Sequence, residues 1–384
     1  MVALSMADGY ARLSGEAQCV IVHVDVGTLA LAAAVHNAAM GRAPVLTFAG
    51  LSLYTIEGKT PYSRTYFIHW IQDVLDQKQI VAQYFRYVGE IKTGKNLKQI
   101  VRRALQLATS HPQGPSYLMG AREVMEENIE PYSINSAVWR PIAPAALLQE
   151  AVREIAEALV NASDPPVIVG FTGRCSDMCF PAEHPGWLGM KYGVDAAIEN
   201  ADVFLILDWD VPWINKLCKP KSSAKVFHLD VEHQYKLLQW IHCGGGGLGW
   251  SGGGALGIKL AADAADALVP GKLKRFVVQI VGDRSYMFSV PSSVYWISAR
   301  YRIPVLAIVL NNLGWNAPRR SMLLVHPDGP ASRATKEELN ISFAPSPDYV
   351  GIARAASNGE IFGAHIVNGS EFEAALNGAV ERLE

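Results

Sequence analysis

Two short apolar segments rich in β-branched residues, 276–281 and 305–310, have the pattern of strands buried on both faces of a parallel sheet. Between them, Pro291 suits the first turn of a helix, and apolar positions follow it at roughly helical spacing. This pattern predicts a right-handed strand–helix–strand unit. Because the carboxyl ends of parallel strands share one edge of the sheet, we expect Asp283 and Asn312 to be neighbours there.

The same alternation of strands and helices extends over the whole chain and predicts α/β domains with parallel sheets in three α/β/α layers. The proline-containing segment 131–144 is typical of a linker. We therefore expect three units, at residues 1–130, 141–243 and 244–384. In the last unit, strands and helices again alternate, through 343–356 and 360–367 to a helix at 371–383.

The composition and net charge of the chain limit the kinds of molecule that it is expected to bind. The chain has 384 residues, of which 50% are hydrophobic, a net charge of −2 and a pI near 6.6. It can bury several cores, and it offers no strong field for nucleic acid or an anionic membrane, so neither partner is expected. The longest apolar window, 26–35, is too short for a transmembrane helix.

The five cysteines are an odd number and do not indicate a disulfide scaffold. They favour a reducing compartment, and we expect a cytoplasmic protein, with the mitochondrion left open because the N-terminus is uninformative. Cys175 and Cys179 lie near His184, but zinc sites favour tighter, paired spacings. Ordinary thiols are the preferred interpretation.

The predicted sheet edge would gather three hard oxygen donors. These are the Asp283 carboxylate, the Asn312 carboxamide and the backbone carbonyl of Gly314. Mg²⁺ prefers octahedral oxygen coordination and is usually held by a few protein groups together with phosphate oxygens. The inferred ligand is a diphosphate. The alternative is that both segments are ordinary turns, which their residue types also favour.

Three segments in order resemble the thiamin diphosphate (ThDP) enzyme family, closest to its acetolactate synthase and benzaldehyde lyase-like branches. Gly282-Asp283 followed by Asn311-Asn312 resembles the GDG…NN signature. The run GGGGLGWSGGGALG at 244–257 resembles the segment that opens the diphosphate-binding domain. The N-terminal MADGYARLSG, followed by VHNAA and APVLTFAG, resembles the pyrimidine-binding domain.

The resemblance implies a pyrimidine-binding domain that lacks its first elements (1–130), a shortened Rossmann-like central domain (141–243) and a diphosphate- and Mg²⁺-binding domain (244–384). FAD is not expected in so short a central domain. Leu248 would wedge between the two cofactor rings. The implied metal ligands are Asp283, Asn312 and Gly314, and the implied cofactor-binding residues are Gly247, Leu248, Gly249, Gly282, Asp283, Arg284, Ser285 and Asn312.

The sequence departs from the family pattern in two places. The catalytic Glu that the resemblance implies would precede Met1, so we assign no catalytic residue within residues 1–384. Asp8 belongs to a different family position and is not assigned this role. Arg284 replaces the second glycine of GDG. Its guanidinium could reach a phosphate oxygen or could block the site. On steric grounds we expect Arg284→Gly to strengthen ThDP binding.

The resemblance implies a ThDP- and Mg²⁺-dependent decarboxylase or carboligase that acts on 2-oxo acids or aldehydes, as a homodimer or homotetramer. One alternative is a non-catalytic or partial chain that binds cofactor, or a full-length partner, without efficient turnover. Another is a nicotinamide-dependent dehydrogenase, because Gly247, Gly249 and Gly252 also spell G-x-G-x-x-G. That fingerprint requires a strand directly before the glycines.

Overall fold

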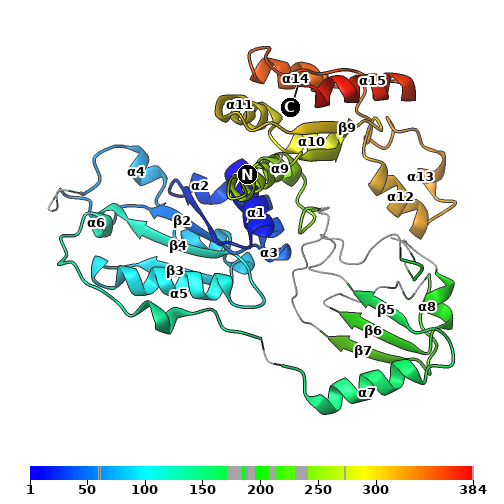
Figure 1. The fold of residues 1–384 in the computed structure, drawn as a ribbon. Coiled ribbons are helices and arrows are strands. Elements are labelled where there is room, and N and C mark those ends of the chain that lie inside the picture. The colour runs from blue at the N-terminus through cyan, green and yellow to red at the C-terminus, as the bar shows by residue number, and fades with distance from the viewer. Residues whose placement is uncertain are drawn as a thin grey trace.

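The computed structural model describes residues 1–58, 60, 62–144, 146–170, 184–186, 188, 195–207, 213, 215, 217–229, 241–271 and 274–382. Within these ranges the chain forms a four-stranded, a three-stranded and a two-stranded sheet, and the strands in each are parallel (Figure 1). The predicted α/β class with parallel sheets is confirmed.

The N-terminal sheet has the order β1-β2-β4-β3. Successive side chains of a strand point to opposite faces, and the two faces pack on different helices. Val45, Ala49 and Tyr117 share a core with α1 and α3, whereas Leu46 and Leu118 pack on α5. The sheet therefore lies between two helical layers. The elements are α1 (Val2–Ser14), β1 (Gln18–Val22), α2 (Val26–Leu29), α3 (Ala32–Met40), β2 (Val45–Leu51), α4 (Ile68–Ile71), η1 (Gln77–Ile80), η2 (Ala82–Tyr84), β3 (Tyr87–Ile91), η3 (Gly94–Asn96), α5 (Leu97–Thr109), β4 (Ser116–Ala121), α6 (Arg122–Met125) and η4 (Ser136–Trp139).

The middle sheet has the order β5-β6-β7 and a small core around Val167, Ala201 and Phe204. Its elements are α7 (Gln149–Val160), β5 (Val167–Gly170), α8 (Ala196–Asn200), β6 (Val203–Leu207) and β7 (Lys225–Leu229). Cys175 and Cys179 lie outside the described residues, so their interpretation as ordinary thiols stays a prediction.

The C-terminal sheet contains the predicted strand–helix–strand unit. β8 pairs in parallel with β9, and α11 begins at Pro291 as expected. A further short helix, α10, begins at Asp283, directly after β8, and the sequence pattern did not predict it. Residues 360–367 form no strand. The elements are α9 (Trp250–Ala267), β8 (Val278–Gly282), α10 (Asp283–Phe288), α11 (Pro291–Tyr301), β9 (Leu306–Leu310), α12 (Asn316–Val325), α13 (Pro330–Arg333), α14 (Tyr349–Ala356) and α15 (Gly369–Val380).

Helices α1 and α9 pack side by side at the centre of the molecule and join the N-terminal and C-terminal units (Figure 1). Glycines form the contact. A methyl group at Gly253 would lie 2.7 Å from the carbonyl oxygen of Val2, and one at Gly257 would overlap the carbonyl oxygen of Met6. A glycine inside a helix costs roughly 0.5–1 kcal/mol relative to alanine. The close backbone approach explains why the helix carries glycines here.

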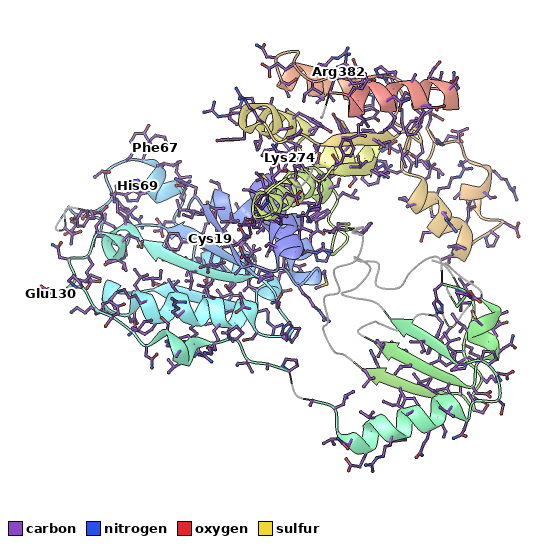
Figure 2. All side chains as sticks on the ribbon, viewed as in Figure 1. Cys19, Phe67, His69, Glu130, Lys274 and Arg382 are labelled. Atoms are coloured by element: carbon purple, nitrogen blue, oxygen red, sulfur yellow. The ribbon has the colours of Figure 1, made fainter. Side chains whose placement is uncertain are left out.

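The surface around α4 is apolar. Tyr66, Phe67 and Ile71 are 60%, 59% and 66% exposed, and Figure 2 shows Phe67 at the outer rim of the N-terminal unit. In the part of the chain that the structure describes, no helix combines the length and apolarity needed to cross a membrane.

We predict that Gly257→Ala destabilises the protein by roughly 1–3 kcal/mol, the usual cost of overpacking, because the new methyl group meets the Met6 backbone. The measurement is the urea midpoint of unfolding, followed by tryptophan fluorescence. The matched control is Gly378→Ala, in helix α15, where the nearest atom to the added methyl group is 3.6 Å away. The control should be neutral or slightly stabilising, and equal effects of the two substitutions would contradict the packing argument.

Candidate functional site

The carboxyl edge of the C-terminal sheet brings Asp283 and Gly314 together. β8 ends at Gly282, so Asp283 leaves the sheet as the first residue of α10. Its side chain is buried, with 3% exposure for the residue. Oδ1 accepts a hydrogen bond from the backbone N–H of Arg284 at 2.8 Å, and Oδ2 accepts one from that of Gly314 at 3.2 Å. The carboxylate is therefore fixed in place by backbone donors.

Asn312 lies in the same loop as Gly314, but its side chain makes no hydrogen bond with Asp283. The residue is exposed, and among the described residues its carboxamide makes no hydrogen bond. Its backbone carbonyl accepts a hydrogen bond from Lys336 Nζ at 3.1 Å. Gly314 has a φ of 144°, which side-chain-bearing residues rarely adopt. The carboxamide oxygen of Asn312 thus stays available to a ligand.

The glycine-rich loop that precedes α9 is clamped by α3 of the N-terminal unit. The buried side chain of Asn37 accepts a hydrogen bond from the backbone N–H of Gly247 at 3.1 Å and donates one to its carbonyl at 2.8 Å. The backbone N–H of Gly246 donates to His36 Nε2 at 3.1 Å. Sequence reasoning noted His36 and Asn37 only as part of a family pattern and missed this role. The adjacent polar pair in an otherwise apolar helix was the signal that could have found it.

The other side of the loop is attached to α10. The backbone N–H of Gly249 donates to Ser285 Oγ at 3.2 Å. Gly249 has a φ of 97°, and a methyl group there would overlap the carbonyl oxygen of Phe288, so glycine is required. Leu248, the predicted wedge, lies between Gly247 and Gly249 and is 37% exposed. The structure therefore joins the predicted ring-binding loop to the helix that begins at Asp283.

Arg284 is buried, with 8% exposure, and stacks on aromatic rings. Its Cζ lies 3.0 Å from the ring centroid of Trp315 and 5.1 Å from that of Phe343. Nε and Nη2 are buried without a hydrogen-bond partner. Desolvation lowers the pKa of Arg284 to about 10, and the charge of Asp283 opposes that shift. The side chain is thus a buried cation at neutral pH, and two of its hydrogen-bond donors are unpaired within the described part of the chain.

Asp8, which the sequence did not mark as catalytic, has a structural role. It is fully buried, and its Oδ2 accepts a hydrogen bond from Trp250 Nε1 at 2.7 Å. Arg12 lies 4.0 Å from Asp8 Oδ1 and donates to the carbonyl of His242 at 2.7 Å. These contacts tie α1 to α9 and to the segment ahead of the glycine-rich loop.

The residues at the sheet edge fit a metal–diphosphate group. Asp283 and the free carboxamide of Asn312 are hard oxygen donors, and the orphaned donors of Arg284 suit an anion. A side chain at Gly282 would meet open space, so a ligand has room there. The described residues contain no group of three or more His, Cys, Asp or Glu side chains that could hold a metal. A metal at Asp283 would therefore depend on amide, carbonyl and ligand oxygens.

Two family models match the chain at its two ends. Residues 1–80 match the model for the thiamine pyrophosphate enzyme, N-terminal TPP binding domain, and residues 223–383 match that for the C-terminal TPP binding domain. The chain belongs to the thiamine pyrophosphate (ThDP) enzyme family. The second match includes the glycine-rich loop.

The curated relatives of this ThDP-family chain include acetolactate synthases. It is 23% identical over 265 residues to acetolactate synthase isozyme 3 large subunit of Escherichia coli K12, a match that covers 60% of this chain and 44% of the relative. It is 26% identical over 139 residues to 2-hydroxyacyl-CoA lyase 2 of Danio rerio, with 36% and 20% covered. The chain thus spans less than half the length of these relatives.

Solved ThDP-dependent decarboxylases share the fold. The thiamine diphosphate-dependent 4-hydroxybenzoylformate decarboxylase of Rhodococcus jostii RHA1 superposes with a TM-score of 0.75 at 18% identity, over 99% of this chain and 88% of that one. Benzoylformate decarboxylase of Polynucleobacter necessarius gives 0.68 at 14% identity, over 100% and 87%. At these identities the likeness establishes the fold alone.

We predict that Asn37→Asp loosens the glycine-rich loop. The new carboxylate can still accept a hydrogen bond from the Gly247 N–H, but it can no longer donate one to the Gly247 carbonyl. It also places a negative charge against that carbonyl oxygen. We expect a loss of roughly 1–3 kcal/mol of interaction free energy. Hydrogen–deuterium exchange of residues 245–249 should become faster. The control is Asn96→Asp, at an exposed position whose side chain makes no capping hydrogen bond. Unchanged exchange in the Asn37 variant would show that this clamp does not hold the loop.

Proposed function

We propose that this chain binds ThDP and Mg²⁺ and acts as an acetolactate synthase-like decarboxylase or carboligase on 2-oxo acids or aldehydes. The observation that carries the proposal is the hydrogen bond from Gly249 N–H to Ser285 Oγ. It attaches the loop that resembles the ring-binding segment to the helix that begins with Asp283. The two segments that we propose to bind the cofactor are therefore next to each other.

The proposed roles follow from the position of each group. Asp283, the Asn312 carboxamide and the Gly314 carbonyl would hold Mg²⁺, which in turn would bind the diphosphate. The backbone around Gly247 and Gly249 would approach the aminopyrimidine, and Leu248 would support the cofactor rings. The clamp by Asn37 keeps this backbone in one conformation, which lowers the entropy lost on binding.

When bound, ThDP supplies the carbon nucleophile and electron sink that 2-oxo acid decarboxylation and carboligation require. The protein contributes binding, orientation and exclusion of water. The substrate class is supported by the names of an acetolactate synthase among the relatives and of 4-hydroxybenzoylformate and benzoylformate decarboxylases among the structural neighbours. We further propose that the working form is a homodimer or homotetramer.

A second candidate is a ThDP-family chain that binds the cofactor, or a full-length partner, without efficient turnover. The observation that favours it is Arg284, which stands where the resemblance expects a glycine next to the diphosphate. A large buried cation there would alter how a diphosphate is positioned. Cofactor binding and turnover therefore need separate tests.

For binding, we predict that Asp283→Asn weakens Mg²⁺-dependent ThDP binding by roughly tenfold or more, because loss of a partner outside the metal shell already costs about 10–100-fold. The substitution keeps the side-chain shape but removes the charge that attracts the metal. Isothermal titration of ThDP in excess Mg²⁺ measures the effect. Asp328→Asn, at an exposed loop position, is the control. Equal affinity of wild type and Asp283→Asn would reject the metal site.

For turnover, we expect the protein loaded with ThDP and Mg²⁺ to release CO₂ from at least one of pyruvate, 2-oxobutyrate and benzoylformate. Asp283→Asn should lower the release at ThDP concentrations that do not saturate the variant, because it weakens binding of the metal-bound cofactor. A coupled CO₂ assay and NMR of hydrogen–deuterium exchange at C2 of bound ThDP provide the measurements. Tight ThDP binding with neither exchange nor CO₂ release would select the non-catalytic alternative.

A further inference from the structure

We propose that the guanidinium of Arg284 binds the diphosphate directly and supplies positive charge that a glycine at this position of the GDG pattern does not carry. This inference rests on the proposed function, since it concerns the same site. The affinity of this chain for a diphosphate should therefore depend less on divalent metal than that of a variant with glycine at position 284.

The first support is a buried charged side chain, two of whose hydrogen-bond donors are unpaired. Arg284 is 8% exposed, and its Nε and Nη2 have no hydrogen-bond partner among the described residues. Burying a charged group without partners is costly, so such groups are normally paired or bind a ligand. The nearest carboxylate in sequence, Asp283, directs its two oxygens to the backbone N–H groups of Arg284 and Gly314. It leaves the side-chain donors of Arg284 free.

The second support is the orientation that stacking imposes. The Trp315 ring lies against the guanidinium at 3.0 Å, and the Phe343 ring lies 6.4 Å from that of Trp315 at an interplanar angle of 87°. Aromatic rings cover faces of a guanidinium and leave its N–H edge, which carries donors in a planar fork. That fork matches two phosphate oxygens. Stacking therefore prepares Arg284 for bidentate binding of a phosphate group.

The third support is the space beside the residue. Outside residues 281–283, no atom of the described residues lies within 4 Å of the position that a Cβ of Gly282 would occupy, so the Arg284 side chain does not fill this space at the end of β8. A side chain that blocked the diphosphate would be expected to occupy it. The packing therefore changes the steric expectation drawn from the sequence: Arg284→Gly should weaken diphosphate binding rather than strengthen it.

The test measures affinity for ThDP and for inorganic pyrophosphate by isothermal titration, both in excess Mg²⁺ and in EDTA. Wild type is compared with Arg284→Gln, Arg284→Gly and Arg284→Lys. The control is Arg300→Gln, because Arg300 also stacks on aromatic rings, at 5.3 Å from Trp296, but is exposed on α11. Thermal melting of each variant confirms that it is folded. Shifts of the wild-type melting temperature by pyrophosphate in EDTA give a second readout.

We expect wild type and Arg300→Gln to bind both ligands in EDTA. Arg284→Gln and Arg284→Gly should bind about tenfold more weakly or worse in EDTA, as loss of a charge-assisted hydrogen-bonded contact predicts, with a smaller loss in Mg²⁺. Arg284→Lys should retain part of the affinity. Unchanged EDTA affinity in Arg284→Gln, or tighter binding by Arg284→Gly, would overturn the inference. Wild type that binds ThDP only with Mg²⁺ would also overturn it and leave the proposed function standing. Wild type that binds ThDP under neither condition would reject both.

Discussion

The close approach of α1 and α9 is the constraint on which the candidate site depends. Glycines in the contact let the two helix backbones touch. A buried hydrogen bond of 2.7 Å from Trp250 Nε1 to Asp8 Oδ2 fixes the position of one helix along the other. The glycine-rich loop runs directly into α9. The position of α9 against α1 therefore decides where the loop meets Asn37 on one side and Ser285 on the other. A bulkier helix pair would move the whole loop away from both anchors.

The loop is held by polar groups because its own residues have almost no side chains. Its backbone groups must still be satisfied, and Asn37, His36 and Ser285 provide the partners. This arrangement leaves Leu248 partly exposed between clamped neighbours. The result is a backbone surface held at several points, with one projecting apolar side chain.

At the sheet edge, the oppositely charged side chains of Asp283 and Arg284 are adjacent in sequence but are not joined by a hydrogen bond. The Asp283 carboxylate accepts hydrogen bonds from two backbone N–H groups. The Arg284 guanidinium instead stacks on Trp315, and two of its buried donors have no hydrogen-bond partner among the described residues. The edge can thus attract a cation and an anion at neighbouring points. A metal-bound diphosphate has this charge pattern, which links the packing of aromatic rings to the chemistry proposed for the site.

The sequence alone determined the parallel α/β units, the strand–helix–strand unit around Asp283 and the family, because alternation of apolar segments and short glycine-rich motifs are local signals. It did not predict α10, or that residues 360–367 form no strand, because short segments have weak periodicity. Tertiary structure decided how Asn37 holds Gly247, 210 residues away, and how Arg284 lies on Trp315 and Phe343. Such contacts join residues that are distant along the chain, and the direction of a long side chain depends on the rings that pack around it, which no local pattern encodes.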